Sequence, residues 1–239
     1  MDTLHGPDPQ ALPTAKPFLG RTIVLRLDER TAQDSTLIED LAFMRRLGVH
    51  PLVVHDVDQR EAGARLVGHL NRIGGDAVAL DGASASTIVL SAADDGRAVV
   101  RSVNAQLVSL LLAQGYIVVF SAEGASFSGV KTTLDATEAA RALAASVHAV
   151  RLLYPSGTGG IPAAGDGVIA ELTSSEALAL AQAGTLPHDE STRLAAAALS
   201  VRSGVDAAQL LDLSVAHATL VEMLTAQHIG TQITSHILL

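Results

Sequence analysis

Two short apolar runs, at 22–27 and 51–55, stand on either side of a segment with helical spacing. Between the runs Leu37, Leu41 and Met44 fall three or four positions apart, which places them on one face of a helix. An apolar run, an amphipathic segment and a second apolar run predict a strand, a helix and a strand. This unit begins a parallel α/β sheet.

The residues that follow each of these strands are acidic. Asp28-Glu29-Arg30 follows the first strand and Asp56-Val57-Asp58 follows the second, and neither triplet contains glycine. In open α/β sheets the ligand site lies beyond the carboxyl ends of the strands. We therefore expect the function of this chain to depend on these two triplets.

Strands and helices continue to alternate along the chain. Capping boxes are predicted at 36–39, 135–138 and 173–176, and two β-rich runs around Asp95-Gly96 predict a hairpin. Further helices are expected at 59–73, 104–115, 135–147, 173–184, 194–201 and 217–227, and strands at 76–80, 87–91, 98–100, 116–120, 150–154, 210–211 and 230–233, the last as an edge strand. The alternation predicts an α/β fold, a three-layer αβα sandwich with a mostly parallel central sheet.

Composition narrows the classes of function. Apolar residues make up 48% of the 239 residues but aromatic residues only 3%, and the formal charge is −9, so we expect no nucleic-acid and no anionic-membrane partner. Cysteine is absent, which removes disulfides and thiolate chemistry. No apolar run has membrane-spanning length. Residues 1–18 contain four prolines and are expected to form a flexible tail rather than a signal peptide, in a cytoplasmic protein.

Six stretches follow one another in a fixed order: Ile23–Leu27 with the helix after it, Pro51–His55, Asp76–Leu80 with the hairpin after it, Val103–Val108 through Gly115–Val119, Ala170–Thr173 with the helix after it, and Leu220–Leu224 with Gly230–Ile233. In this order they resemble the amino-acid kinase family, and within it the acetylglutamate kinases. The resemblance implies an amino-acid kinase (carbamate kinase-like) fold, with residues 19–145 as the acceptor-side lobe and 146–239 as the nucleotide-side lobe. It also implies transfer of the γ-phosphoryl group of ATP, with Mg²⁺, to the carboxylate of N-acetylglutamate in arginine biosynthesis.

The family's catalytic positions carry other residues here. The resemblance places the two phosphate-binding lysines at Arg26 and Arg193, and the aspartate that orients them at Thr137. The first glycine cradle falls on Asp28 and Glu29, and the second, after the strand-ending His55, falls on Asp56, Val57 and Asp58. The Gly-Gly-Met before the second lysine corresponds to His188-Asp189-Glu190. Residues 59–75 are too few for the family's hairpin and helix, which carry the substrate-binding arginine.

These replacements oppose a bound nucleotide. Glycine cradles work because backbone N–H groups approach phosphate oxygens closely, and an acidic side chain both blocks and repels. Two like charges ~5 Å apart at an effective dielectric of ~20 repel by roughly 3 kcal/mol. Arginine offsets part of this but is no neutral exchange for lysine. The leading hypothesis is a degenerate, non-catalytic relative that binds a small ligand or regulates a related kinase, as a homodimer or as that kinase's partner.

Two alternatives stay open. One is a working kinase that uses the arginines and a Mg²⁺ recruited by the aspartates, and the other is a sensor of arginine. The loop after the strand at 150–154 contains Gly157, Gly159 and Gly160, which suggests a phosphate loop but lacks the lysine of one, so a surface loop is the competing interpretation. His188-Asp189-Glu190 is interpreted as a solvated, acidic helix start rather than as a metal site. No metal site is predicted.

Overall fold

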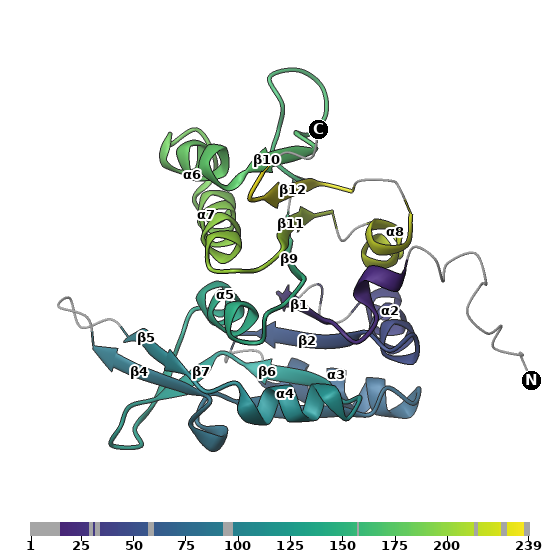
Figure 1. The fold of residues 1–239 in the computed structure, drawn as a ribbon, viewed down its shortest axis with the longest axis vertical. Coiled ribbons are helices and arrows are strands. Elements are labelled where there is room, and N and C mark those ends of the chain that lie inside the picture. The colour runs from purple at the N-terminus through teal and green to yellow at the C-terminus, as the bar shows by residue number, and fades with distance from the viewer. Residues whose placement is uncertain are drawn as a thin grey trace, which may run out of the picture.

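The computed structural model describes residues 15–28, 31, 34–56, 60–92, 98–156, 158–212, 215–225 and 229–236. Two sheets make up its β structure (Figure 1). The central sheet has eight strands: β1 (Thr22–Leu27), β2 (His50–His55), β3 (Ala77–Asp81), β6 (Ile117–Ser121), β9 (Arg151–Pro155), β10 (Glu171–Thr173), β11 (Ala207–Leu211) and β12 (Thr231–Thr234). The smaller sheet has four: β4 (Ile88–Ala92), β5 (Ala98–Val103), β7 (Glu123–Ala125) and β8 (Lys131–Thr133).

The central sheet runs in the order β10-β12-β11-β9-β1-β2-β6-β3. All of its neighbouring strands pair in parallel except β11 and β12, which are antiparallel. In this order β1 pairs with β2 on one side and with β9 on the other, so the sheet is continuous across the boundary at 145/146. The predicted three-layer architecture with a mostly parallel sheet is confirmed.

Helices cover both faces of this sheet (Figure 1). Strand residues alternate between the faces, so Val24 packs with the helices of one face and Leu25 with those of the other. The helices that contribute to the Val24 face are α4 (Gln106–Ala113), α5 (Ala136–Ser146), α6 (Ser174–Gln182) and α7 (His188–Arg202); those of the Leu25 face are α2 (Ser35–Arg46), α3 (Arg60–Arg72) and α8 (Ala218–Leu224). Two 3-10 turns, η1 (Lys16–Phe18) and η4 (Ser84–Ser86), complete the elements.

The predicted hairpin is confirmed, because β4 and β5 pair antiparallel. Its turn lies outside the described residues. A second hairpin, β7 and β8, follows β6 and lies beside β4. The small sheet thus follows β6, near the end of the central sheet that carries β6 and β3.

Two local predictions were wrong in detail. The N-cap of α2 is Asp34, whose carboxylate accepts from the amides of Thr36 and Leu37, so no capping box begins at Thr36. β12 lies inside the sheet, between β10 and β11, because β10 takes the edge. In contrast, the capping box of Thr173 and Glu176 is present in both directions.

Within the described part of the chain, no helix combines the length and the apolar character needed to cross a membrane.

Candidate functional site

Arg26 lies near the carboxyl end of β1, and its side chain is only 10% exposed. Its Nη2 donates to Oδ2 of Asp56 at 2.9 Å, so the structure brings these two predicted site residues together. The Nε and Nη1 atoms are buried and find no partner among the residues described. The guanidinium of Arg26, which the resemblance places at a lysine position of the family, is therefore held by a carboxylate of the same chain.

The carboxylate of Asp28 accepts hydrogen bonds from Thr31, three residues later in the chain. Its Oδ1 accepts from both the amide and the hydroxyl of Thr31, each at 2.9 Å, and the amide of Asp28 in turn donates to that hydroxyl. These bonds join Asp28 to Thr31 just after β1, where the resemblance implies a glycine cradle. Glu29 lies outside the described residues, as do Val57 and Asp58.

His55 ends β2 with its ring buried against α3. Its Nδ1 donates to the backbone carbonyl of Asp56 at 2.8 Å. The Nε2 atom lies so close to Gly63 that an added Cβ there would be 2.3 Å from it. Glycine at position 63 is therefore what allows the histidine to occupy this place.

The second arginine is also held by an acidic side chain. Nη1 of Arg193 lies 3.5 Å from Oε1 of Glu190, one helical turn earlier on α7, and the two side chains are 17% and 7% exposed. The hydroxyl of Ser156, just beyond β9, donates to both carboxylate oxygens of Glu190 at 3.3 Å. His188-Asp189-Glu190 does start a helix, as expected, but Glu190 is buried rather than solvated.

Thr137 lies in the first turn of α5 and is buried. Its backbone carbonyl accepts from the hydroxyl of Tyr154 at 3.2 Å, which fastens α5 to β9. Burial raises the pKa of that phenol far above its ordinary value, so Tyr154 stays neutral. The position assigned to the family's orienting aspartate thus contributes no charge here.

In the glycine loop after β9, two backbone amides donate to hydroxyl groups of the same chain. The amide of Gly160 donates to Ser156 Oγ at 3.0 Å, and the next amide, of Ile161, donates to Thr231 Oγ1 at 2.8 Å. A Cβ on Gly160 would lie 2.9 Å from Thr231 Oγ1. The described part of this loop, including Gly159, packs against the sheet; Gly157 lies outside the described residues. Gly159 and Gly160 therefore serve close packing.

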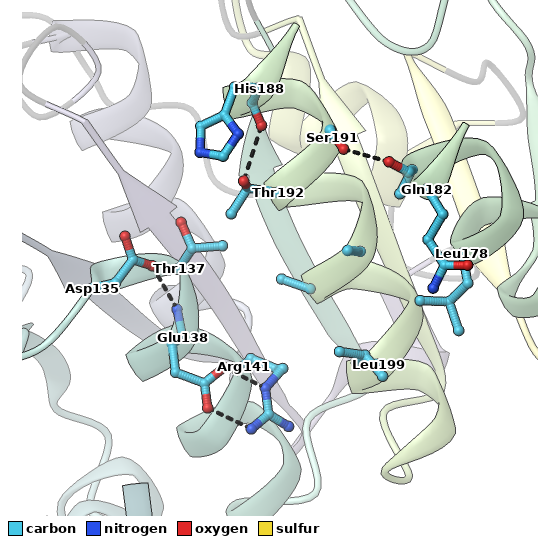
Figure 2. A pocket seen from close by; sticks show the side chains of 13 residues that line it. Asp135, Thr137, Glu138, Arg141, Leu178, Gln182, His188, Ser191, Thr192 and Leu199 are labelled. Atoms are coloured by element: carbon cyan, nitrogen blue, oxygen red, sulfur yellow. Dashed lines mark hydrogen bonds and ion pairs between the residues drawn. The ribbon is translucent and has the colours of Figure 1, made fainter. Parts of the chain in front are cut away.

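A cavity of about 360 Å³ lies between α5 and α7 (Figure 2). Thr137 and His188 border its upper end, whereas neither Arg26 nor Arg193 lines it. Glu138 and Arg141 form a two-pronged ion pair along one wall, both bonds 2.6 Å long. This bond raises the pKa of Arg141 above its ordinary value. The opposite wall, from α6 and α7, combines apolar side chains with the polar side chains of Gln182, His188, Ser191 and Thr192.

One pair of residues joins the two predicted lobes, and sequence reasoning did not find it. Nδ1 of His217, at the start of α8, lies 2.6 Å from Oδ1 of Asp40, which is buried in the middle of α2. Burial raises the pKa of Asp40 to about 6, against the lowering effect of this hydrogen bond. The hydrogen bond raises the pKa of His217. The sequence did contain one signal of this pair: Asp40 is an acidic residue on the buried face of α2.

Each of the two arginines at a predicted site position is thus paired with a carboxylate, Arg26 with Asp56 and Arg193 with Glu190. In the described residues no ion pair connects one pair to the other. No group of three or more histidine and acidic side chains suited to a metal ion occurs in that same part of the molecule. The site therefore offers two arginines that are each paired with a carboxylate, an uncharged Thr137, and a glycine loop in which the amides of Gly160 and Ile161 are already bonded.

Comparison with known proteins gives a consistent result. The sequence model of the amino acid kinase family matches residues 56–203. The acetylglutamate kinase of Synechococcus sp. (strain WH7803) is 28% identical over 94% of this chain and 92% of its own length. The acetylglutamate kinase of Nautilia profundicola is 25% identical over 93% of this chain and 94% of its own.

Solved structures share the fold. N-acetylglutamate synthase from Neisseria gonorrhoeae, complexed with coenzyme A and N-acetyl-glutamate, superposes with a TM-score of 0.82 at 22% identity. The match covers 96% of this chain but 63% of the synthase, so the chain spans less than two thirds of that protein. Carbamate kinase from Giardia lamblia bound to AMP-PNP gives a TM-score of 0.68 at 12% identity over 91% of this chain and 99% of its own.

Proposed function

Because the chain belongs to the amino acid kinase family, we propose that it is an acetylglutamate-kinase-like member that has lost phosphoryl transfer and keeps the fold for binding and regulation. One observation carries the proposal: each arginine at a lysine position of the family is held by a carboxylate from the same chain. Asp56 holds Arg26 and Glu190 holds Arg193.

The positions of these carboxylates explain why they oppose the reaction. Phosphoryl transfer depends on positioning and on positive charge that stabilises the transferred group. By the resemblance, Asp56 corresponds to a cradle glycine of the family, and Glu190 corresponds to the methionine of the Gly-Gly-Met that precedes the second lysine. A phosphate that approached either guanidinium would meet this carboxylate. Two like charges ~5 Å apart at an effective dielectric of ~20 repel each other by roughly 3 kcal/mol.

The orienting charge is missing as well. Thr137 is bonded through its backbone to Tyr154 and has no carboxylate with which to align the arginines. In the described part of the glycine loop, the amide of Gly160 donates to Ser156 Oγ and the amide of Ile161 donates to Thr231 Oγ1. The proposed role is therefore regulatory: the chain binds a small molecule or a related kinase of arginine biosynthesis in the cytoplasm, as a homodimer or as that kinase's partner.

Two measurements test the proposal. Isothermal titration with ATP and Mg²⁺ is expected to show no binding up to millimolar nucleotide. A coupled assay of ADP release with N-acetylglutamate is expected to show no turnover above a sample without protein. The working-kinase alternative makes the opposite prediction, namely micromolar binding of ATP and turnover that disappears in Arg26→Ala. That result would overturn the proposal.

A further inference from the structure

Three strands of the central sheet bring polar residues into one row. His55 pairs in register with Ser121, and Ser121 pairs in register with Asp81, so β2, β6 and β3 present these residues side by side at their carboxyl ends. Residues in register on parallel strands point to the same face of the sheet. Here that face is the one covered by α3, because the ring of His55 lies against Gly63.

A cavity of about 270 Å³ opens over this row. Val119 and Ala79, two positions before Ser121 and Asp81, form its apolar floor, and α3 supplies the wall. Ser84 and Glu123 complete the polar part of the lining. The cavity is smaller than a nucleotide site requires and suits a compact molecule with one polar end.

Ser121 is the residue that indicates a ligand. It is 8% exposed, and its Oγ is buried without a hydrogen-bond partner. A buried hydroxyl left unpaired costs about 1–3 kcal/mol, and native structures seldom retain that cost. Ser121 stands in the centre of the row and is one of the residues that line the cavity. A bound molecule would supply the missing bond.

The carboxylates that line the cavity determine which ligand charge it favours. Asp81 is ionised, since hydrogen bonds from Lys131 and Ser84 lower its pKa despite its partial burial, and Lys131 Nζ lies 2.7 Å from its Oδ2. Glu123 adds a second, buried carboxylate. An ionised carboxylate offers about four acceptor sites, so one partner does not exhaust it. A ligand group rich in donors fits this surface, and an anion is repelled by it.

We propose that this cavity binds a small molecule through a primary ammonium group, which donates to Ser121 Oγ and to the carboxylate of Glu123 while a short apolar part lies on Ala79 and Val119. The site is separate from both arginine pairs. It does not depend on the loss of phosphoryl transfer, because the proposed ligand carries no phosphate.

Three probes of one size test the charge. Propylammonium, propanol and propionate have the same carbon chain and differ in the polar end. Amide chemical shifts of the ¹⁵N-labelled full chain are followed during each titration. Propylammonium is expected to shift the amides of Ser121, Asp81 and Ala64 with millimolar affinity, propanol more weakly, and propionate not at all. Equal response to propionate, or no response to any probe, would overturn the proposal.

Three variants test the location. Ser121→Ala removes the hydroxyl and is expected to weaken propylammonium binding by about fivefold or more. Ala64→Phe adds a ring at an exposed position of α3 that borders the cavity, and is expected to abolish binding while the protein stays folded. Ser109→Ala on the exposed face of α4 is the matched control and is expected to bind as the parent does. Parent-like binding by both Ser121→Ala and Ala64→Phe would place the ligand elsewhere and refute the assignment.

Discussion

Replacing Asp40 by asparagine is expected to make the protein more stable at alkaline pH. Asp40 is buried between α2 and α8, and its carboxylate meets the half-exposed ring of His217. Burial raises the pKa of Asp40 from its ordinary value of 3.8 to about 6. A raised pKa means that the folded state prefers the protonated acid, so its contribution to stability is complete below pH 3.8 and is lost as the pH rises through 6.

The size of the effect follows from that difference. Each unit of pKa corresponds to ~1.36 kcal/mol, so the full loss is about 3 kcal/mol, of which about 1.4 kcal/mol falls between pH 5 and pH 8. His217 acts in the same direction, because its raised pKa also gives stability that is lost as the pH rises through the folded value. Asparagine cannot ionise but still donates to or accepts from a neutral imidazole. Asp40→Asn should gain about 1–2 kcal/mol over the parent at pH 8, after about 1 kcal/mol for the weaker hydrogen bond.

Urea denaturation at pH 5, 6, 7 and 8 measures this directly. The difference in unfolding free energy between Asp40→Asn and the parent should grow with pH. Asp34→Asn is the control on the same helix: hydrogen bonding lowers the pKa of Asp34, so its contribution is already constant above pH 5, and asparagine caps a helix as well as aspartate does. If Asp40→Asn and the parent lose stability equally between pH 5 and pH 8, the assigned cause is wrong.

Two further predictions concern the site. Gly63→Ala should lower the melting temperature by several degrees, because its Cβ would lie 2.3 Å from Nε2 of His55. The control is Gly68→Ala on the same helix, whose Cβ would meet nothing within 4 Å and which should raise the melting temperature. Thermal melts followed by circular dichroism compare the two variants, and equal melting temperatures would contradict the contact. The double variant Asp56→Gly, Glu190→Met removes the carboxylates from both arginines and should gain binding of ATP with Mg²⁺ that isothermal titration can measure. It should also be less stable than the parent, because buried charges lose their partners. If the double variant still does not bind ATP, other features block the nucleotide.

The order of elements could be predicted because local patterns and global fold agree. β1, β2 and β6 are continuous apolar runs, and the strands of a parallel sheet buried on both faces have this character. β10 has only three residues, so its pattern is too short to distinguish a strand from a loop, and the position of β12 inside the sheet depends on it. The cap at Asp34 was missed because Asp34, Ser35 and Thr36 are all good capping residues.

The site could be located but not assembled from the sequence. The positions of Arg26 and Arg193 follow from the resemblance, and so does the acidic character around them. That Glu190 turns inward to Ser156 depends on the packing of α7 against the sheet. The row of His55, Ser121 and Asp81 depends on strand order and register, because these residues come from three separate stretches of sequence. Contacts of this kind are set by tertiary structure alone.

The backbone pairing of β1 with β9 also limits how this protein can move. Ile23, Val24 and Leu25 are in register with Arg151, Leu152 and Leu153, so the two predicted lobes share one hydrogen-bonded ladder (Figure 1). Opening the lobes as rigid jaws would break that ladder in the middle of the core. Sheets instead deform by changing the twist between neighbouring strands. β3 and β10 are the two edges of this sheet, so any change in their relative orientation has to be shared by the six strands between them.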